Sequence, residues 1–347
     1  MTDVTEFEAL QSDEKAEASA RHLLRIVTAQ RDELQRRLEV TGRLASHEIK
    51  PPAWMATKAK RSIHHATPTL LLTDNHFDEI VLPEQIDWLN AYNRDIAEKR
   101  LRLCIESTIQ IAREYFAGLK YDGFLLMLGG DLLSGIIHQE LRETNEGPIL
   151  RSIDHWEGQM AAAIERLATE FGKLHIACTY GNHGRQSKKP VAKNRAWDNF
   201  EWLMYCHLAK HFKASKNITF QIPDAADCHV TSYGVRYNLT HGDQFRGGSG
   251  IAGALSPLML GQVRKSRRGV AAGMTYDVLV MGHWHNHIWL PSKGIIAGGC
   301  MKGYDEYAYV SNFDYEPANQ ALWLTTPEHG ITFPVQVFCQ DRESEGW

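Results

Sequence analysis

Five apolar segments of this chain each end at a residue type that can bind a metal ion. The clearest is the run 276–281, which has the length of a buried strand, turns at Gly282 and then presents His283 and His285. Where a chain stays extended, residues i and i+2 point to the same side, so both imidazoles can approach one centre. A lone His-x-His after a strand is more often an ordinary polar turn. The other four segments therefore decide the interpretation.

Those four segments end in the same manner. In chain order, they lead to Asp74 and His76, to Gly129-Gly130-Asp131, to Gly181-Asn182-His183, and to His241. In open α/β sheets the ligand crevice lies at the carboxyl ends of the strands, where such polar residues would gather. Five strand ends of this kind predict a metal centre at one edge of a sheet.

The order Asp-x-His, Gly-Asp, Gly-Asn-His, His, Gly-His-x-His resembles the calcineurin-like metallophosphoesterase family over residues 74–285. Within that family, the chain is similar to the branch of phosphodiesterases and DNA-repair exonucleases, and it resembles a bacterial or phage member. The resemblance implies an α/β fold, a four-layer α/β/β/α sandwich of two packed mixed β-sheets with the metals at one edge. It implies one ion on Asp74, His76, Asp131 and His285, and a second on Asp131, Asn182, His241 and His283.

In this resemblance Asp131 is the shared ligand, and His183 protonates the leaving oxygen or stabilises its charge. A carboxylate shared by two divalent ions can hold them roughly 3.5–4 Å apart, the spacing of two-metal hydrolytic sites. Imidazole nitrogens with carboxylate and amide oxygens suit Mn²⁺, Fe or Zn²⁺ better than Ca²⁺ or Mg²⁺. We therefore expect two divalent ions, with manganese first and iron or zinc as alternatives.

Two positions depart from the family pattern. The family usually has Asp or Glu after the motif histidine, and here Gly184 follows His183, so the group that orients His183 must come from elsewhere. The family's DNA double-strand-break nucleases carry a further histidine shortly after the shared aspartate. In this chain Asp131 is followed by Leu-Leu-Ser, with His138 later, which weakens that particular comparison.

Basic residues follow two of the motifs. One cluster is Arg185, Lys188, Lys189, Lys193 and Arg195, and the other, between His241 and His283, is Arg264, Lys265, Arg267 and Arg268. Arg185 and the whole second cluster are the predicted substrate-binding residues, which could grip the phosphates of DNA or RNA, although solvated surface is an equal alternative. The glycine-rich segment 245–273 predicts a lid, whose apolar part 255–260 would dock as a short helix.

The remaining chain predicts an N-terminal helical extension and linker, 1–62, followed by a catalytic domain, 63–347. Residues 13–40 lack Gly and Pro and place Leu24, Val27, Leu34 and Leu38 at a and d positions. This helix would either form a homodimer or lie on its own catalytic domain. Helices are expected within 83–119, 151–171 and 194–212. Trp197 and other aromatic residues of the last are expected in the core, with a base-stacking platform as the less favoured alternative. Short strands beyond residue 217 predict a second sheet packed on the first.

Composition and charge narrow the class of protein and the partners that can be expected. A net charge of -4 does not suggest a protein coated in nucleic acid, and no apolar run approaches the length of a membrane span. The six cysteines form no Cys-x-x-Cys and are expected to be reduced, so we expect a cytoplasmic protein without a membrane partner.

The expected function is metal-dependent hydrolysis of phosphoester bonds by a binuclear centre. A phosphodiesterase or nuclease is the first expectation, and a phosphomonoesterase acting on a protein or a small molecule is the alternative. A non-catalytic interaction module on the same fold is disfavoured, because every candidate ligand position carries a competent residue type.

Overall fold

The computed structural model describes residues 17, 19–36, 52–56, 65–246 and 255–347. Its contacts divide the chain into two units, Met1–Lys50 and Pro51–Trp347. In the first unit, residues 19–36 are helical and almost all exposed, whereas Leu38 lies outside the described residues. The homodimer through this helix stays a prediction. Residues 53–56 lie in the second unit, where Met55 is buried, and the division of the chain at residue 62 stays a prediction.

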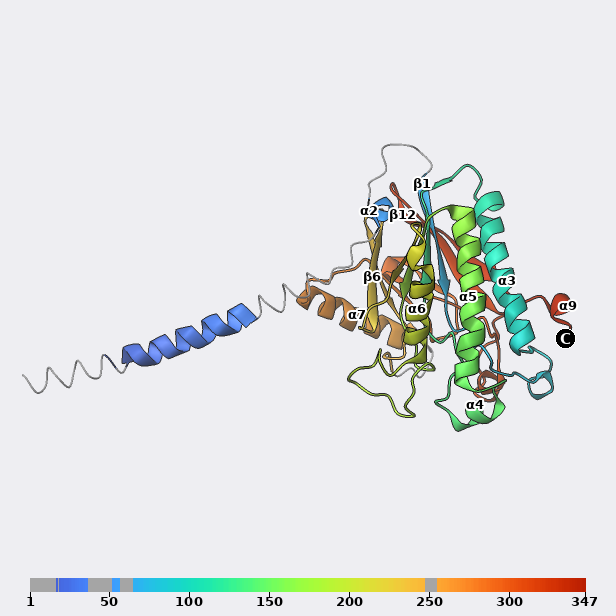
Figure 1. The fold of residues 1–347 in the computed structure, drawn as a ribbon, viewed down its shortest axis with the longest axis horizontal. Coiled ribbons are helices and arrows are strands. Elements are labelled where there is room, and N and C mark those ends of the chain that lie inside the picture. Colours follow the sequence, from blue (N-terminus) through green and yellow to red (C-terminus); the bar gives the residue numbers. More distant parts are fainter. Residues whose placement is uncertain (1–16, 18, 37–51, 57–64, 247–254) are drawn as a thin grey trace, which may run out of the picture. The chain divides into compact units, whose positions relative to one another are not determined.

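Two mixed β-sheets form the centre of the second unit (Figure 1). Strands β1, β3, β4 and β5 of the first sheet run parallel. On the other side of β1, β11 pairs antiparallel with β1, and β12 pairs antiparallel with β11. The order of the first sheet is β12 (Gly330–Phe338), β11 (Asn319–Thr326), β1 (His65–Leu72), β3 (Phe124–Leu128), β4 (Leu174–Cys178) and β5 (Ile218–Gln221), with β2 (Lys120–Tyr121) beside β1. The order of the second is β6 (Asp227–Ser232), β7 (Val235–Thr240), β8 (Val278–Met281), β10 (Ile295–Ala297) and β9 (Ile288–Leu290).

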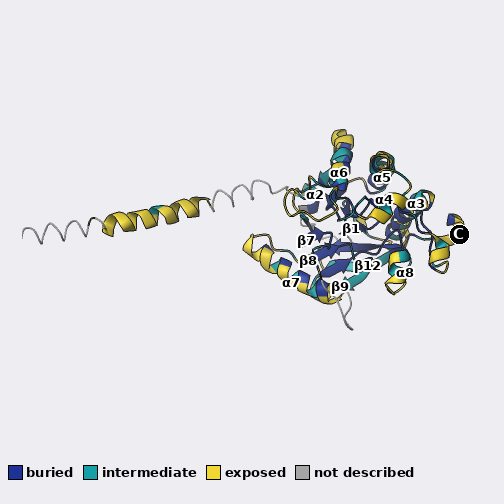
Figure 2. Cartoon of the chain, turned by 90° about the horizontal axis from the view of Figure 1, so that it is seen from below, coloured by how far each residue is buried: buried dark blue, intermediate teal, exposed yellow. Residues whose placement is uncertain are grey.

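Helices cover the outer face of each sheet. Helices α3 (Arg94–Gln110), α5 (Ile149–Phe171) and α6 (Phe200–His211) pack side by side on the first sheet (Figure 1), and α7 (Leu255–Ala271) packs on the second with an exposed outer side (Figure 2). The short elements are α2 (Ala53–Ala56), η1 (Pro83–Gln85), η2 (Ile111–Tyr115), α4 (Gln139–Thr144), η3 (Phe212–Ala214), η4 (Pro291–Lys293), α8 (Glu306–Val310) and α9 (Arg342–Glu345). Across the described ranges, no helix combines the length and apolar character that crossing a membrane requires.

The layers follow from the alternation of side chains along buried strands. In β1, Leu70 and Leu72 pack under the helices, while Leu71 packs between the two sheets. In β3, Leu126 packs under the helices and Leu125 between the sheets. A strand with apolar residues on both faces must be covered on both faces. The four-layer α/β/β/α sandwich is therefore confirmed, with its two outer layers made of helices.

The second sheet has fewer members than predicted, and α7 is longer. Strands β5, β11 and β12 lie beyond residue 217 yet belong to the first sheet. Strand β11 pairs with β1 in the register of Thr67–Leu71 on Thr325–Ala321, so it satisfies the backbone groups that an open β1 edge would expose. Strand β12 then adds to β11, and β5 adds to β4 at the other end. Helix α7 has 17 residues, not the short helix expected over 255–260, and the glycines of 247–254 lie outside the described residues.

The buried His175 should make the stability of the fold depend on pH. Its ring contacts Thr219 Oγ1 at 2.9 Å and Gln221 Oε1 at 3.3 Å, and burial lowers its pKa to about 4. The unfolded chain binds this proton near pH 6.5, so the free energy of unfolding should fall by roughly 3 kcal/mol as the pH drops from 6.5 to 4.

Urea unfolding of the wild type and of His175→Gln, in EDTA across this pH range, measures the effect. Because glutamine does not titrate, the difference in unfolding free energy between the two proteins should shrink as the pH falls. A constant difference would show that His175 does not contribute to the pH dependence.

Candidate metal centre

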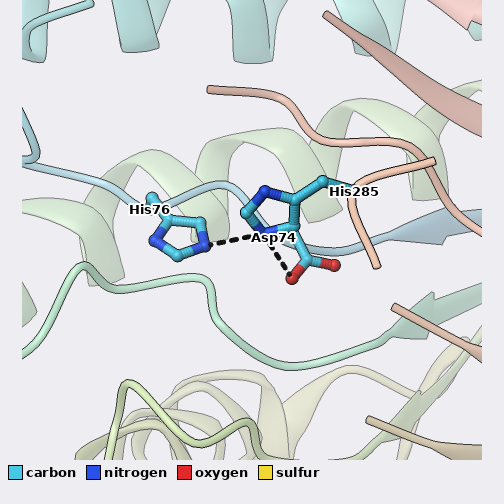
Figure 3. A group of neighbouring side chains, drawn as sticks. All are labelled: Asp74, His76 and His285. Carbon is cyan, nitrogen blue, oxygen red and sulfur yellow. Dashed lines mark hydrogen bonds and ion pairs between the residues drawn. The ribbon is translucent and has the colours of Figure 1, made fainter. Parts of the chain in front are cut away.

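The first candidate group consists of Asp74, His76 and His285, whose side chains point toward one another (Figure 3). Asp74 and His76 follow the end of β1, and His285 lies beyond β8 in the other sheet. His76 Nε2 lies 3.2 Å from His285 Nε2, and His285 Nε2 lies 3.4 Å from Asp74 Oδ1. The edges of the two sheets therefore meet at this group.

The second candidate group consists of Asp131, His241 and His283, from the ends of β3, β7 and β8. His241 Nε2 lies 2.9 Å from Asp131 Oδ2 and 3.2 Å from Asn182 Oδ1, while its Nδ1 lies 2.9 Å from the Gly129 carbonyl oxygen. Burial opposes a charge on His241, but the Asp131 carboxylate outweighs it and raises the pKa of His241 to about 10. An ion bound here would displace that proton, and His241, with Nδ1–H donating to the carbonyl, would then present the lone pair of Nε2 to the ion. Asn182 Oδ1 thus lies beside the second group.

A third group joins the other two. It consists of His76, Asp131 and His183, so it takes one residue from each of the first two groups. The rings of His76 and His183 lie 4.5 Å apart. All seven predicted metal ligands therefore lie in one continuous cluster, with Asp131 at its centre.

The donor set fits divalent ions in three respects. Ligands of one first-row ion sit about 2.0–2.2 Å from it and therefore roughly 3 Å from one another, which matches the 2.9–3.4 Å between neighbouring donor atoms here. Asp74 Oδ1 is buried and, apart from the 3.4 Å contact with His285, has no hydrogen-bond partner among the described residues. Burial lowers the pKa of His76 and of His283 to about 4, so both rings are neutral near pH 7 and have a free lone pair.

The backbone is strained where these side chains converge. Asp74, His76, Asp131, His283 and His285 all have φ between 49° and 70°, in the left-handed region that non-glycine residues seldom occupy. The expectation that 283–285 stays extended is therefore wrong. Each histidine turns separately, so His283 joins the group of Asp131 and His285 the group of Asp74. This division is the one that the family resemblance implied.

The orientation of His183 comes from the loop after β3. Its Nδ1 lies 2.8 Å from the Ser134 carbonyl oxygen, and its backbone N–H donates to Asp131 Oδ1 at 2.7 Å. With Nδ1–H donating to that carbonyl, Nε2 remains for another partner. His138, noted in the sequence for its place after Asp131, lies with its ring 5.8 Å from that of His183.

Glu201, which the sequence analysis did not identify, occupies the space beside Gly184. A Cβ on residue 184 would come within 2.6 Å of Asn199 Oδ1 and 2.7 Å of Glu201 Cγ, so only glycine fits there. Glu201 is fully buried in the first turn of α6 and accepts the backbone N–H groups of Asp131, Leu133 and Gly181 at 3.1, 3.1 and 2.8 Å. It ties together the two loops that carry Asp131 and Asn182. Burial and the charge of Asp131 raise its pKa to about 7.

A second residue outside the motifs, Glu79, orients the side chain of His76. Its Oε2 lies 3.1 Å from His76 Nδ1, and its Oε1 accepts from Lys302 Nζ at 2.8 Å. A carboxylate behind a histidine ligand fixes the tautomer and raises its basicity. The three-residue spacing from His76 was the only sequence signal for this contact, and Lys302 had none.

The predicted substrate-binding residues are not all free. Arg185 donates to the carbonyl oxygens of Asn182, Ser187 and Lys188 in its own loop. Lys265 is 4% exposed, and both it and Arg268 pair with Asp227. Arg264 and Arg267 lie on the exposed side of α7.

Comparisons with known proteins add little to this geometry. No family model and no curated protein matches the chain. Among solved structures, the sulfate thiohydrolase SoxB of Thermus thermophilus, with glycerol, aligns at 10% identity and a TM-score of 0.30, covering 80% of this chain and 57% of its own. A putative 5'-nucleotidase of Staphylococcus aureus, with alpha-ketoglutarate, aligns at 10% identity and a TM-score of 0.29, covering 80% of this chain and 55% of its own. The chain spans little more than half the length of each.

Glu201→Gln should weaken metal binding while leaving the chain folded. The amide oxygen can replace Oε2, which accepts from both Asp131 and Gly181, but the NH₂ group then faces the Leu133 N–H. The loop of Asp131 therefore loses one contact, and the negative charge that attracts all three N–H groups is removed. A loss of about 10- to 100-fold in Mn²⁺ affinity is typical when a residue that orients ligands is changed.

Calorimetric Mn²⁺ titration measures the affinity, and circular dichroism verifies the fold. Glu165→Gln, on an exposed position of α5, serves as the control because it removes the same charge far from these contacts. A folded Glu201→Gln protein with the affinity of the control would exclude the anchoring role.

Proposed function

We propose that this protein is a binuclear metal-dependent phosphoesterase of the calcineurin-like type, acting on phosphodiesters as a phosphodiesterase or nuclease. One observation carries the proposal: the buried Asp131 lies in two overlapping groups of metal-ligating residues, next to a histidine that is not needed as a ligand. Two adjacent ions that share a carboxylate form the arrangement that stabilises both the attacking and the leaving oxygen of an in-line displacement.

The residues of the chain have separate tasks in this reaction. Asp74, His76 and His285 would hold one ion, Asn182, His241 and His283 the other, and Asp131 both. The ions supply Lewis acidity and lower the pKa of bound water. His183, oriented by the Ser134 carbonyl, gives a proton to the leaving oxygen from Nε2. Manganese is the metal we propose, with iron or zinc accepted by the same nitrogen and oxygen donors.

Asp131→Asn should remove most of the bound metal and of the activity while the protein stays folded. The change deletes the shared negative charge at nearly constant volume, and His241 loses its carboxylate partner. We expect a loss in kcat/KM of about 100-fold or more, above the upper limit seen for residues that only orient ligands.

The assay compares bis-p-nitrophenyl phosphate, p-nitrophenyl phosphate and single- and double-stranded DNA, with Mn²⁺ or EDTA, and metal content is measured in parallel. Asp314→Asn, an exposed aspartate, is the matched control. Hydrolysis of the monoester alone would favour the phosphomonoesterase alternative. Full turnover with two bound ions in Asp131→Asn would refute the shared-ligand assignment.

His183→Ala should leave metal content intact and slow hydrolysis in a way that depends on the leaving group. A proton donor contributes typically ~10²- to 10⁴-fold, and it matters least when the leaving oxygen is already a good one. The loss should therefore be larger for an alkyl phosphodiester than for a nitrophenyl one. The exposed His211, changed to Ala, is the control. Equal losses for both leaving groups would mean that His183 binds phosphate without donating a proton.

A further inference from the structure

A basic loop, residues 185–199, leaves the candidate metal centre and returns to it. It starts just after His183, and its far end is held at the same place, because Phe200 N–H donates to the Gly184 carbonyl at 2.7 Å and Asn199 Nδ2 to the Gly181 carbonyl at 2.9 Å. Figure 1 shows this yellow-green loop beyond the lower end of α6. The two ends of the loop are therefore held together next to Asn182, the candidate metal ligand.

Internal contacts give this loop a defined shape. Arg185 donates to three carbonyl oxygens at its start, and Ser187 Oγ donates to Asp198 Oδ2 at 2.7 Å across it. Arg195 pairs with Asp243, two residues after the ligand His241. The two arginines and the single carboxylate of the loop are therefore used inside the fold. Lys188, Lys189 and Lys193 are exposed and face solvent.

Trp197 lies on the same loop and is mostly exposed to solvent. The sequence predicted a core position, but the side chain is 62% exposed, so that prediction is wrong. The indole lies against Trp202 of α6, with ring centroids 4.5 Å apart and planes inclined by 44°. Trp202 supports one side of the ring, which leaves a broad aromatic surface open. An exposed aromatic ring on the same loop as exposed cations is the combination that proteins use to bind single strands.

We propose that Trp197 with Lys188, Lys189 and Lys193 binds single-stranded nucleic acid and leads it to the metal centre. The inference rests on the proposed function and deepens it by naming the substrate class. Lysines bind a phosphate backbone without reading its sequence, and an aromatic ring stacks on an unpaired base of any kind. In a duplex the base faces are already stacked, so Trp197 has no partner there.

The charges on the loop favour this partner over other anionic partners. Five cations and one carboxylate lie between residues 185 and 198 in a chain of net charge -4, so the positive field is local. An acidic protein or an anionic lipid surface could pair with the lysines, but it offers no unpaired base to stack on the exposed indole. DNA and RNA strands share the recognised chemistry.

Binding is measured apart from catalysis, with labelled oligothymidylate or oligouridylate in EDTA, by fluorescence anisotropy over a range of salt. Trp197→Ala should raise Kd by about 5- to 100-fold, because stacking on that ring is lost, whereas Trp197→Phe should keep most of the affinity. Changing Lys188, Lys189 and Lys193 together to Gln should reduce the slope of log K against log salt by about 2.

Two control proteins match these changes. Lys210, Lys213 and Lys216, exposed lysines at the far end of α6 and beyond it, are changed to Gln together, and the 53% exposed Trp88 is changed to Ala. Neither should alter Kd or the salt slope. The lysine control tests whether a change in Kd comes from the loop surface itself or from the lower net charge of the whole protein.

The outcomes separate this proposal from the proposed function. Unchanged oligonucleotide affinity in both Trp197→Ala and the Lys188, Lys189 and Lys193 variant would overturn the binding surface, as would equal affinity for a duplex, or tighter binding to phosphatidylserine vesicles or polyglutamate. Trp197→Ala should hydrolyse bis-p-nitrophenyl phosphate at the wild-type rate. If the wild type does not hydrolyse that diester with Mn²⁺ while strand binding behaves as expected, the proposed function fails and the binding surface stands.

Discussion

The buried carboxylate of Asp131 is the group on which the rest of this site depends. Burial alone would raise its pKa, but the charges on His241 and His183 hold the pKa well below its usual range. Its two oxygens contact His241 Nε2 and the His183 backbone N–H, and its own N–H donates to Glu201. A buried charge is tolerated only when it is paired and hydrogen-bonded. The ends of β3, β4 and β7 must therefore meet at one point, and the sandwich brings them there.

The strained backbone of the ligands is held by that same sandwich. Left-handed conformations at residues such as Asp74 and Asp131 each cost of order 1–3 kcal/mol and persist only where the surroundings over-determine them. The strands before them are buried on both faces, by Leu70 and Leu72 on one side and Leu71 on the other. Layers that are packed on both sides leave these strands little freedom to relax. Rigid strand ends can then hold irregular turns in the geometry that metal ions need.

Local patterns predicted what depends on local sequence. Strands β3, β4 and β10 begin and end where their apolar runs do, and all the motif ligands cluster as expected. Long-range pairing could not be read in this way: β11 completes the open edge of β1, across about 250 residues of chain. Glu201 carries no motif, and its role exists only because α6 places it beside Gly184. The exposure of Trp197 likewise depends on where its loop is fastened, whereas burial frequencies describe only the average tryptophan.

The first turn of α6 links the metal centre to the loop that follows it. Asn199 caps the helix and binds the Gly181 carbonyl, Glu201 gathers three backbone N–H groups of the metal loops, and Trp202 supports Trp197. With the carboxylate supplied from α6, position 184 must be glycine, and the chain is free to leave the site there and return at Asn199. The helix that holds the loops of Asp131 and Asn182 thus also holds the exposed surface of the loop. A change in how α6 begins would therefore disturb metal binding and the basic loop together, whereas a change at Trp197 would disturb the loop surface alone.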